Sequence, residues 1–193
     1  KSKSGTVLIE IPGILGEIVE KRLVTIEQAK KKRPLVELRT IAENSSVPLS
    51  LQRTIGAKSG ISLIAEMKRS SPSAGSLDPD LDPANRAALY CDAGAAAISV
   101  LTEHDYFSGS IEDLAAVSII ARASRVPVLR KDFIVDEYQV HEARAAGADC
   151  ILLIIAILDH KQYEDLFIAS TSMGMDVIVE VFDEPELDIA MNI

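Results

Sequence analysis

The sequence has no tryptophan, and it contains only two cysteines and three histidines in 193 residues. Cys91 and Cys150 lack the C-x-x-C spacing of redox and metal motifs and lie in Ala-rich or apolar surroundings, so we predict buried thiols in a reducing compartment. His104, His141 and His160 are too scattered for a zinc site by their spacing, and we expect surface or hinge positions for them. No metal site is therefore expected.

Long apolar runs and an excess of positive charge are also missing. The longest nearly uncharged runs, Cys150–Leu158 and Ala93–Thr102, are about half the length that a membrane helix needs, and no signal-peptide pattern is present. The 20 basic and 29 acidic residues give a formal net charge of −9, which disfavours binding to nucleic acid or anionic lipid. We predict a soluble, cytoplasmic protein with no nucleic-acid or membrane partner; an organelle-targeting leader upstream of Lys1 stays open.

The apolar content of 48% is enough for the core of one domain. The pattern of apolar residues differs between its first 60 residues and the rest. Residues 1–60 are predicted to be a helical extension. Apolar residues recur at helical spacing over Ile14–Lys32, and a second helix is expected from Pro34 to a polar stop at Glu43–Ser46.

Residues 61–193 alternate short apolar runs with helical patterns, which predicts a parallel sheet. The expected strands are Ile61–Met67, Ala95–Thr102, Val126–Arg130, Cys150–Ala156 and Asp176–Val181. The expected helices are Pro83–Asp92, Ile111–Ala123, Asp136–Ala145, His160–Met173 and Glu184–Met191. Gly94, Gly147 and Gly174 each close a helix just before the next strand, as in a repeated β/α unit. A (β/α)₈ barrel usually has about 250 residues, so a barrel would be represented here by about five units.

Charged residues end three of the predicted strands, and catalysis in parallel α/β folds takes place at these ends. Period-two alternation puts Glu66 and Lys68 on one side, where they would form a buried ion pair facing a barrel axis. The same parity directs Lys131 and Glu180 inward from two other strands. Single strand-end charges commonly extend into solvent, but four from three strands favour a proton-transfer site of lysine acids and carboxylate bases.

Two loops at the same ends allow a functional and a structural interpretation. The small-residue loop Arg69–Ser76 has donors that could hold an anion, although such loops are usually only turns. Tyr106 and Phe107 could stack on an aromatic substrate, and packing against a neighbouring loop is an equal alternative.

At these residues the sequence resembles the indole-3-glycerol phosphate synthase family of tryptophan biosynthesis. The matching stretches are Ile64–Ser73, Ile98–Glu103, Phe107–Ser110, Pro127–Ile134, Tyr138–Gln139, Glu142–Arg144, Gly147–Asp149, Leu152–Ile154 and Val179–Glu180. They follow the order and spacing of the family from about residue 12 to the last residue. Related phosphate-binding barrels lack this combination of E-x-K-x-x-S-P-S and L-R-K-D-F.

The resemblance implies a TIM barrel, present here as five β/α units, and a cofactor-free carboxy-lyase. Its reaction closes the ring of 1-(2-carboxyphenylamino)-1-deoxyribulose 5-phosphate to indole-3-glycerol phosphate, with loss of CO₂ and water. By this resemblance Lys131 is the general acid that protonates the ketone, and Lys68 binds the carboxylate and protonates the departing hydroxyl. Glu180 stabilises or deprotonates the cationic intermediate, and Glu66 orients Lys68. Which lysine serves which step stays open.

The resemblance also implies a binding pocket and a cover. Ser71 would bind the substrate carboxylate, Phe107, Phe133 and Leu152 would line the anthranilate pocket, and residues 1–60 would cover the barrel mouth. The family's sixth-strand asparagine and its phosphate loops after strands seven and eight have no counterpart in this sequence. The 193-residue segment is expected to be either a fragment of a longer enzyme or a chain that a partner completes. Alone, it is therefore expected to be inactive and to be poorly stable or self-associating.

A non-catalytic barrel segment that serves only for assembly or binding is the alternative function. Fusion to, or association with, other tryptophan-pathway enzymes is left open by the sequence.

Overall fold

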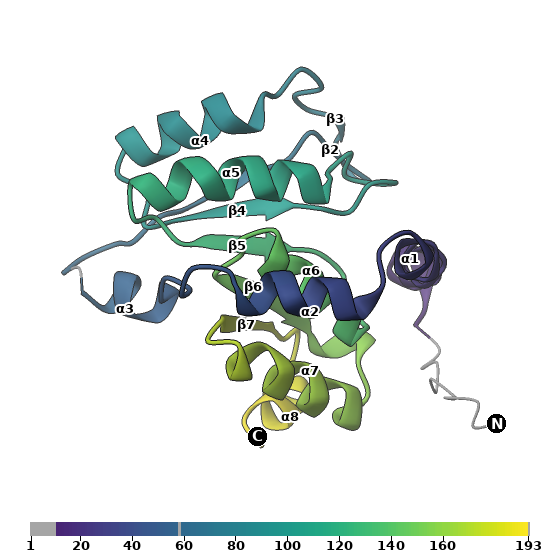
Figure 1. Ribbon diagram of the computed structural model, residues 1–193. Coiled ribbons are helices and arrows are strands. Elements are labelled where there is room, and N and C mark those ends of the chain that lie inside the picture. The colour runs from purple at the N-terminus through teal and green to yellow at the C-terminus, as the bar shows by residue number, and fades with distance from the viewer. Residues whose placement is uncertain (1–10, 58, 193) are drawn as a thin grey trace.

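A five-stranded parallel sheet is the framework of the computed structural model, which describes residues 11–57 and 59–192 (Figure 1). The sheet contains β1 (Ile64–Met67), β4 (Ala97–Leu101), β5 (Val128–Lys131), β6 (Cys150–Ile154) and β7 (Asp176–Glu180), in that spatial order. A short antiparallel hairpin of β2 (Ser70–Ser71) and β3 (Gly75–Ser76) follows β1. The predicted five β/α units of a TIM barrel are confirmed, and the described residues form no closed barrel.

Helices precede the sheet and connect its strands. They are α1 (Gly13–Lys32), α2 (Leu35–Glu43), α3 (Leu51–Gly56), α4 (Pro83–Asp92), α5 (Ile111–Ala123), α6 (Glu137–Ala145), α7 (His160–Ser172) and α8 (Glu184–Ala190), with a 3₁₀ turn at Ile155–Ile157. Six of the helices begin where a side chain accepts a backbone N–H of the first turn: Ser50, Asp82, Ser110, Asp136, Asp159 and Asp183. Each cap of this kind stabilises a helix by about 1 kcal/mol, so the sequence itself sets these starting points.

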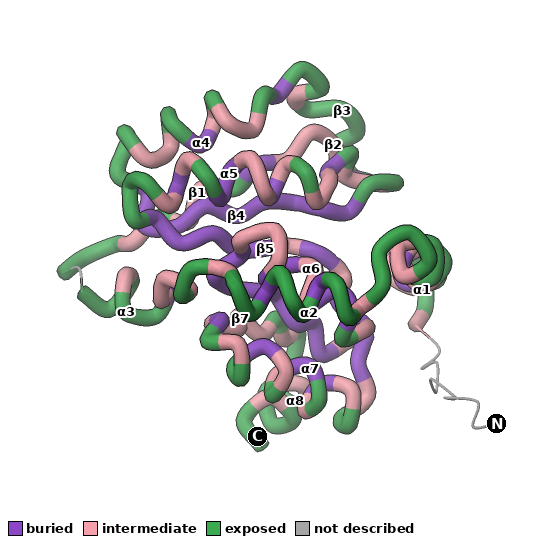
Figure 2. The backbone as a smooth tube through the Cα atoms, viewed as in Figure 1, coloured by how far each residue is buried: buried purple, intermediate pink, exposed green. Residues whose placement is uncertain are grey.

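The core lies between the sheet and the helices that cross over it. All residues of the central strands β4 and β6 are buried, whereas β1 and β7 are only partly covered (Figure 2). The helix α2 packs on α6, outside the sheet, while α1 is seen end-on beside the carboxyl ends of the strands (Figure 1). The predicted helices of the extension are therefore attached to the sheet, although residues 1–10 and 58 of the extension lie outside the described part.

Two differences from the sequence prediction go beyond shifts of one or two residues at the ends of elements. The first strand was expected from Ile61 but begins at Ile64, because β1 pairs with β4 only from Ile64 opposite Ala97, and Ile61 is 100% exposed. The helix α3 was not predicted, since six residues leave no apolar repeat. Ser50 starts this helix by accepting the N–H of Arg53, and its hydroxyl also donates to the distant Asp176.

The cysteines and histidines correct two expectations about burial. Cys150 is fully buried, as predicted, but Cys91 on α4 is only half-buried. His104 and His160 are exposed, whereas His141 is half-buried, with Nε2 3.1 Å from Glu137 Oε1. No helix within the described ranges is long and apolar enough to span a bilayer.

We expect the two thiols to react at very different rates. Burial raises the pKa of the Cys150 thiol to about 12, so almost no thiolate forms at neutral pH, and the side chain is shielded as well. An aromatic disulfide reagent should label one thiol of the native protein quickly, and Cys91→Ser should abolish this fast phase. Fast labelling that survives in Cys91→Ser would mean that the sheet opens readily at β6.

Candidate active site

A cavity of about 300 Å³ lies where the strands end at their carboxyl sides. Residues from β1, β4, β5, β6 and β7, together with the segments after β1, β4 and β5, line it. The lining residues are Glu66, Lys68, Leu101, Phe107, Lys131, Asp132, Phe133, Leu152, Ile154 and Glu180. Seven of the eight candidate site residues named from the sequence thus share one cavity.

The four charged candidates form two ion pairs. Lys68 Nζ lies 3.2 Å from Glu66 Oε1, and Lys131 Nζ lies 3.6 Å from Glu180 Oε2. The expected buried ion pair of Glu66 and Lys68 is wrong in one respect, because each side chain is about one-third exposed. The reason is that β1 is an edge strand in the described sheet, so no further strand covers it. The site is therefore a half-open cavity with two ammonium and two carboxylate groups.

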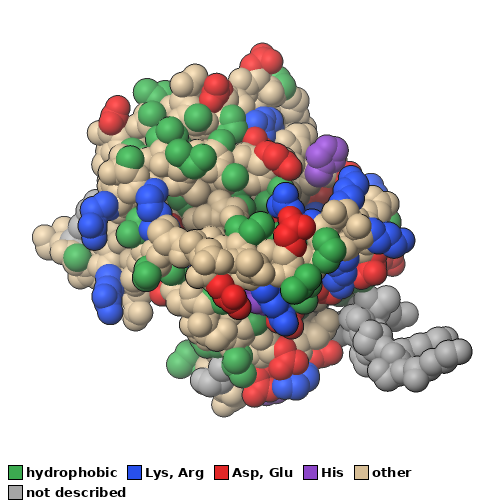
Figure 3. All heavy atoms as spheres, viewed as in Figure 1, with side chains coloured by type: hydrophobic (Ala, Val, Ile, Leu, Met, Phe, Trp, Pro, Cys, Tyr) green, Lys and Arg blue, Asp and Glu red, His purple; other side chains and the backbone are tan. Residues whose placement is uncertain are grey.

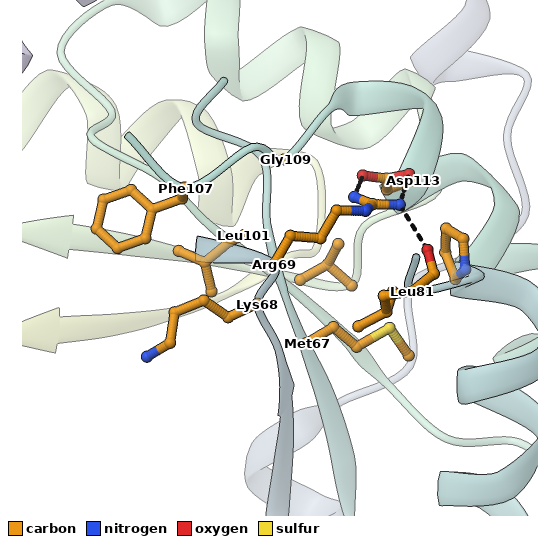
Figure 4. Close-up of a pocket in the computed structure, with 10 residues that line it drawn as sticks. Met67, Lys68, Arg69, Leu81, Leu101, Phe107, Gly109 and Asp113 are labelled. Atoms are coloured by element: carbon orange, nitrogen blue, oxygen red, sulfur yellow. Dashed lines mark hydrogen bonds and ion pairs between the residues drawn. The ribbon is translucent and has the colours of Figure 1, made fainter. Parts of the chain in front are cut away.

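The apolar part of the cavity is formed by two phenylalanines and a leucine. The rings of Phe107 and Phe133 have centroids 6.0 Å apart, and Leu152 comes from the buried strand β6. The side chains of Phe107 and Lys68 point to one side of the β1 end, whereas Arg69 points to the other, toward Asp113 (Figure 4). The two nitrogen–oxygen distances of the Arg69–Asp113 pair are 2.5 and 3.1 Å, which ties the loop after β1 to α5.

In the loop after β4, the two aromatic residues Tyr106 and Phe107 have different surroundings, so the substrate-stacking interpretation fits only one of them. Phe107 lines the cavity, but Tyr106 lies outside it, with Lys21 Nζ of α1 4.5 Å from the ring centroid. The buried carboxylate of Glu103 accepts the backbone N–H groups of Asp105, Tyr106 and Phe107. These bonds hold the loop in the shape that turns Phe107 inward.

Ser71 is the one candidate that does not line this cavity. It is buried in the β2–β3 hairpin, where its hydroxyl accepts the N–H of Ala74 at 3.1 Å. Ser70 donates its hydroxyl to the carbonyl of Tyr106 at 3.0 Å. The hydroxyl of Ser71 thus makes a local bond, as in the simple turn interpretation, whereas Ser70 links this loop to the loop after β4.

Sequence reasoning missed a buried network around Asp132, the residue between Lys131 and Phe133. Asp132 Oδ2 accepts bonds from Thr102 at 2.5 Å, from Arg22 of α1 at 2.8 Å and from Arg130 at 3.0 Å. The usable signal was the parity of Arg130 and Asp132, which is opposite to that of Lys131 and places two charges on the other side of the strand. Arg22 could not be found in this way, because it lies 110 positions away in the chain.

The charges in this network stabilise each other. Burial by itself would raise the pKa of Asp132, but Arg22 and Arg130, with the hydroxyl of Thr102, outweigh burial and hold this pKa below its usual value. Burial likewise opposes the charge of Arg130, and Glu142 with Asp132 overcomes it and raises the pKa of Arg130. Lys131 and Phe133 therefore flank an ionised, rigidly bonded carboxylate.

Comparison with known proteins agrees with this geometry. The family model for indole-3-glycerol phosphate synthase matches residues 15–193. The synthase of Desulfosudis oleivorans is 43% identical over 182 residues, which cover 93% of this chain and 68% of that relative. The synthase of Campylobacter fetus is 42% identical over 178 residues, covering 92% of this chain and 68% of the relative. That of Mycolicibacterium gilvum is 45% identical over 179 residues, covering 93% and 64%. The chain, which spans about two thirds of the length of these relatives, belongs to the indole-3-glycerol phosphate synthase family, the carboxy-lyases of tryptophan biosynthesis.

Proposed function

We propose that the cavity at the strand ends carries out the family's ring closure, with Lys131 as the general acid. The observation that carries this proposal is the gathering of two lysines, two glutamates and two phenylalanines around one cavity of about 300 Å³. The substrate combines an aromatic ring, a carboxylate and a ketone. The cavity offers apolar ring contacts and ammonium groups that suit all three parts.

In the first step, the ring carbon that bears the carboxylate attacks the ketone carbon. The ketone oxygen takes a proton from the Lys131 ammonium and becomes a hydroxyl group. The bond to the carboxylate then breaks, CO₂ leaves, and its electron pair restores the aromatic ring. Glu180, 3.6 Å from Lys131, is suited to stabilise the cation formed in between.

In the second step, water is lost. The Lys68 ammonium donates a proton to the departing hydroxyl, and a carboxylate accepts the proton released when the indole double bond forms. Glu180 is the proposed acceptor, and Glu66, 3.2 Å from Lys68, orients that lysine. In the alternative assignment, Lys68 protonates the ketone oxygen and Lys131 protonates the departing hydroxyl. The same protons are then donated and accepted.

Substrate binding and shielding complete the proposal. The rings of Phe107 and Phe133, with Leu152, would hold the anthranilate ring, and Ser71 would bind the carboxylate after release from its bond to Ala74. Within the extension expected to cover the mouth, residues 1–60, α1 would provide the cover and exclude water, whereas α2 packs on α6 and the loop after it lies at the other end of the sheet. This cover is supported by α1, whose neighbouring residues Lys21 and Arg22 contact the loops after β4 and β5.

The direct test is conversion of 1-(2-carboxyphenylamino)-1-deoxyribulose 5-phosphate by the purified full-length enzyme. We expect indole absorbance and fluorescence to appear together with one CO₂ per product, without added metal or cofactor. The acceleration should exceed about a millionfold, as is usual for enzymes. Substrate that binds to the protein and is recovered unchanged would contradict the proposal and favour a binding role.

A further inference from the structure

A second cavity lies at the opposite end of the sheet from the proposed active site. Its volume is about 480 Å³, and it is lined by the loop after α2, the last turns of α5 and the end of α6. The lining residues are Ser45, Ser46, Ala115, Ser118, Ile119, Arg122, Arg144, Ala145, Ala146 and Gly147, with no carboxylate among them. Figure 3 shows Lys and Arg side chains at the left of the molecule, toward the end where α2 and α5 finish.

The positive charge at this cavity exceeds the negative charge. Arg122 pairs with Asp149 at 2.8 Å, and that carboxylate also accepts the N–H groups of Leu49 and Val128. Arg144 is only 2% exposed, and its bonds within the described part of the chain go to the carbonyls of Ala148 and Ser46, which are neutral. Two guanidinium groups therefore share one carboxylate.

A buried guanidinium without a carboxylate partner is energetically costly. Burial lowers the pKa of Arg144 and the charge of Arg122 adds to this effect; together they outweigh the attraction of Asp149, which shows the direction of this cost. The carbonyl groups at the ends of α5 and α6 offset little of the cost of burying this guanidinium. Carbonyls of both helix ends already accept backbone N–H groups, from Val126 and Ala148. A guanidinium has five N–H donors, so both arginines retain donors beyond the two bonds found for each.

A second polar group of the cavity also lacks a partner. Ser118 is 8% exposed, and its hydroxyl makes no hydrogen bond with any described residue. It stands against Gly147, where a Cβ would lie 2.8 Å from Ser118 Cβ, so the two helices meet closely here. Buried hydroxyl groups without a partner are rare in proteins and commonly mark a ligand or water site.

We propose that this cavity binds a phosphate group, held by Arg122, Arg144 and the hydroxyl of Ser118. The planar forks of the arginines match phosphate oxygens, and the hydroxyl supplies a neutral donor. The volume admits a small phosphorylated metabolite as well as free phosphate. The site is independent of the proposed reaction, because it lies at the far end of the strands and shares no residue with the catalytic cavity.

The test is a titration at constant ionic strength, with chloride exchanged for inorganic phosphate or glycerol phosphate. Binding is measured by calorimetry and by the rise in unfolding temperature, which a native-state ligand produces. We expect saturable binding of both anions; tighter binding of the ester would identify a phosphorylated metabolite as the ligand. The same affinity in Lys131→Met would place binding outside the catalytic cavity.

Ser118→Ala separates a ligand site from a structural arginine pair. The variant loses a hydroxyl that has no protein partner, so its fold should be unharmed, while its affinity for phosphate should fall about tenfold. Arg144→Gln should abolish binding, and Arg39→Gln, which breaks the pair with Glu137 on the outside of α6, should leave it unchanged. Unchanged affinity in Ser118→Ala, or no saturable binding by the parent protein, would overturn the proposal even if Arg144→Gln fails to fold.

Discussion

Lys131→Met is expected to lower turnover by about 10²–10⁴-fold, because it removes the proton donor for the ketone oxygen. Methionine keeps the length of the side chain but carries no proton to donate. The loss should fall mainly on kcat, since the apolar contacts of Phe107 and Phe133 with the substrate remain. Steady-state kinetics with the anilino-deoxyribulose phosphate measures both constants.

A matched control is Lys161→Met on α7. This lysine is 71% exposed, pairs with Glu164 and Asp165 and does not line the catalytic cavity, so turnover should be unchanged. Both variants should unfold at nearly the parent temperature, because neither lysine is part of the core. If Lys131→Met kept turnover within about threefold of the parent, Lys131 would not be the general acid.

Asp132→Asn is expected to reduce the free energy of unfolding by about 3–5 kcal/mol, the usual effect of breaking a buried ion pair, because Arg22 loses its carboxylate partner and Arg130 keeps only Glu142. Arg130 is 1% exposed and Arg22 is 11% exposed in their side chains, so neither can recover solvation without moving. Denaturant unfolding, followed by circular dichroism, measures this difference. A change below about 1 kcal/mol would mean that the network contributes no more than a surface ion pair.

The stability lost in Asp132→Asn should depend on pH in a defined direction. The folded pKa of Asp132 lies below its value in the unfolded chain, which is about 3.9. The stabilisation is therefore complete above that value and disappears as the pH falls toward the folded pKa. The parent and Asp132→Asn should converge in acid, while Asp165→Asn, an exposed control on α7, should differ little from the parent throughout.

Much of the fold could be predicted because its signals are local. Continuous apolar runs gave β4 and β6, which are buried along their whole length. Acidic or hydroxyl side chains cap six helices, so these starting points are also set by nearby residues. The parity of residues along each strand was enough to direct Lys131 and Glu180 into the same cavity, because side-chain direction in a strand alternates strictly.

Other features depend on residues far apart in the chain, and no local pattern reveals them. The start of β1 depends on where β4 offers a pairing partner, and α3 depends on Ser50, which bonds Asp176. The exposure of Glu66 and Lys68 depends on which strands lie beside β1. The alternation of side chains along a strand predicts none of these three features.

The sequence by itself determined the β/α repeat, the family and the set of charged residues at the strand ends, since each is written in short stretches of chain. Only the tertiary structure decided that Arg22 of α1 bonds the carboxylate beside Lys131, and that Arg122, paired with Asp149, lines one cavity together with Arg144. The reason is physical: the cost of a buried charge depends on every group around it, and those groups come together only when the chain has folded.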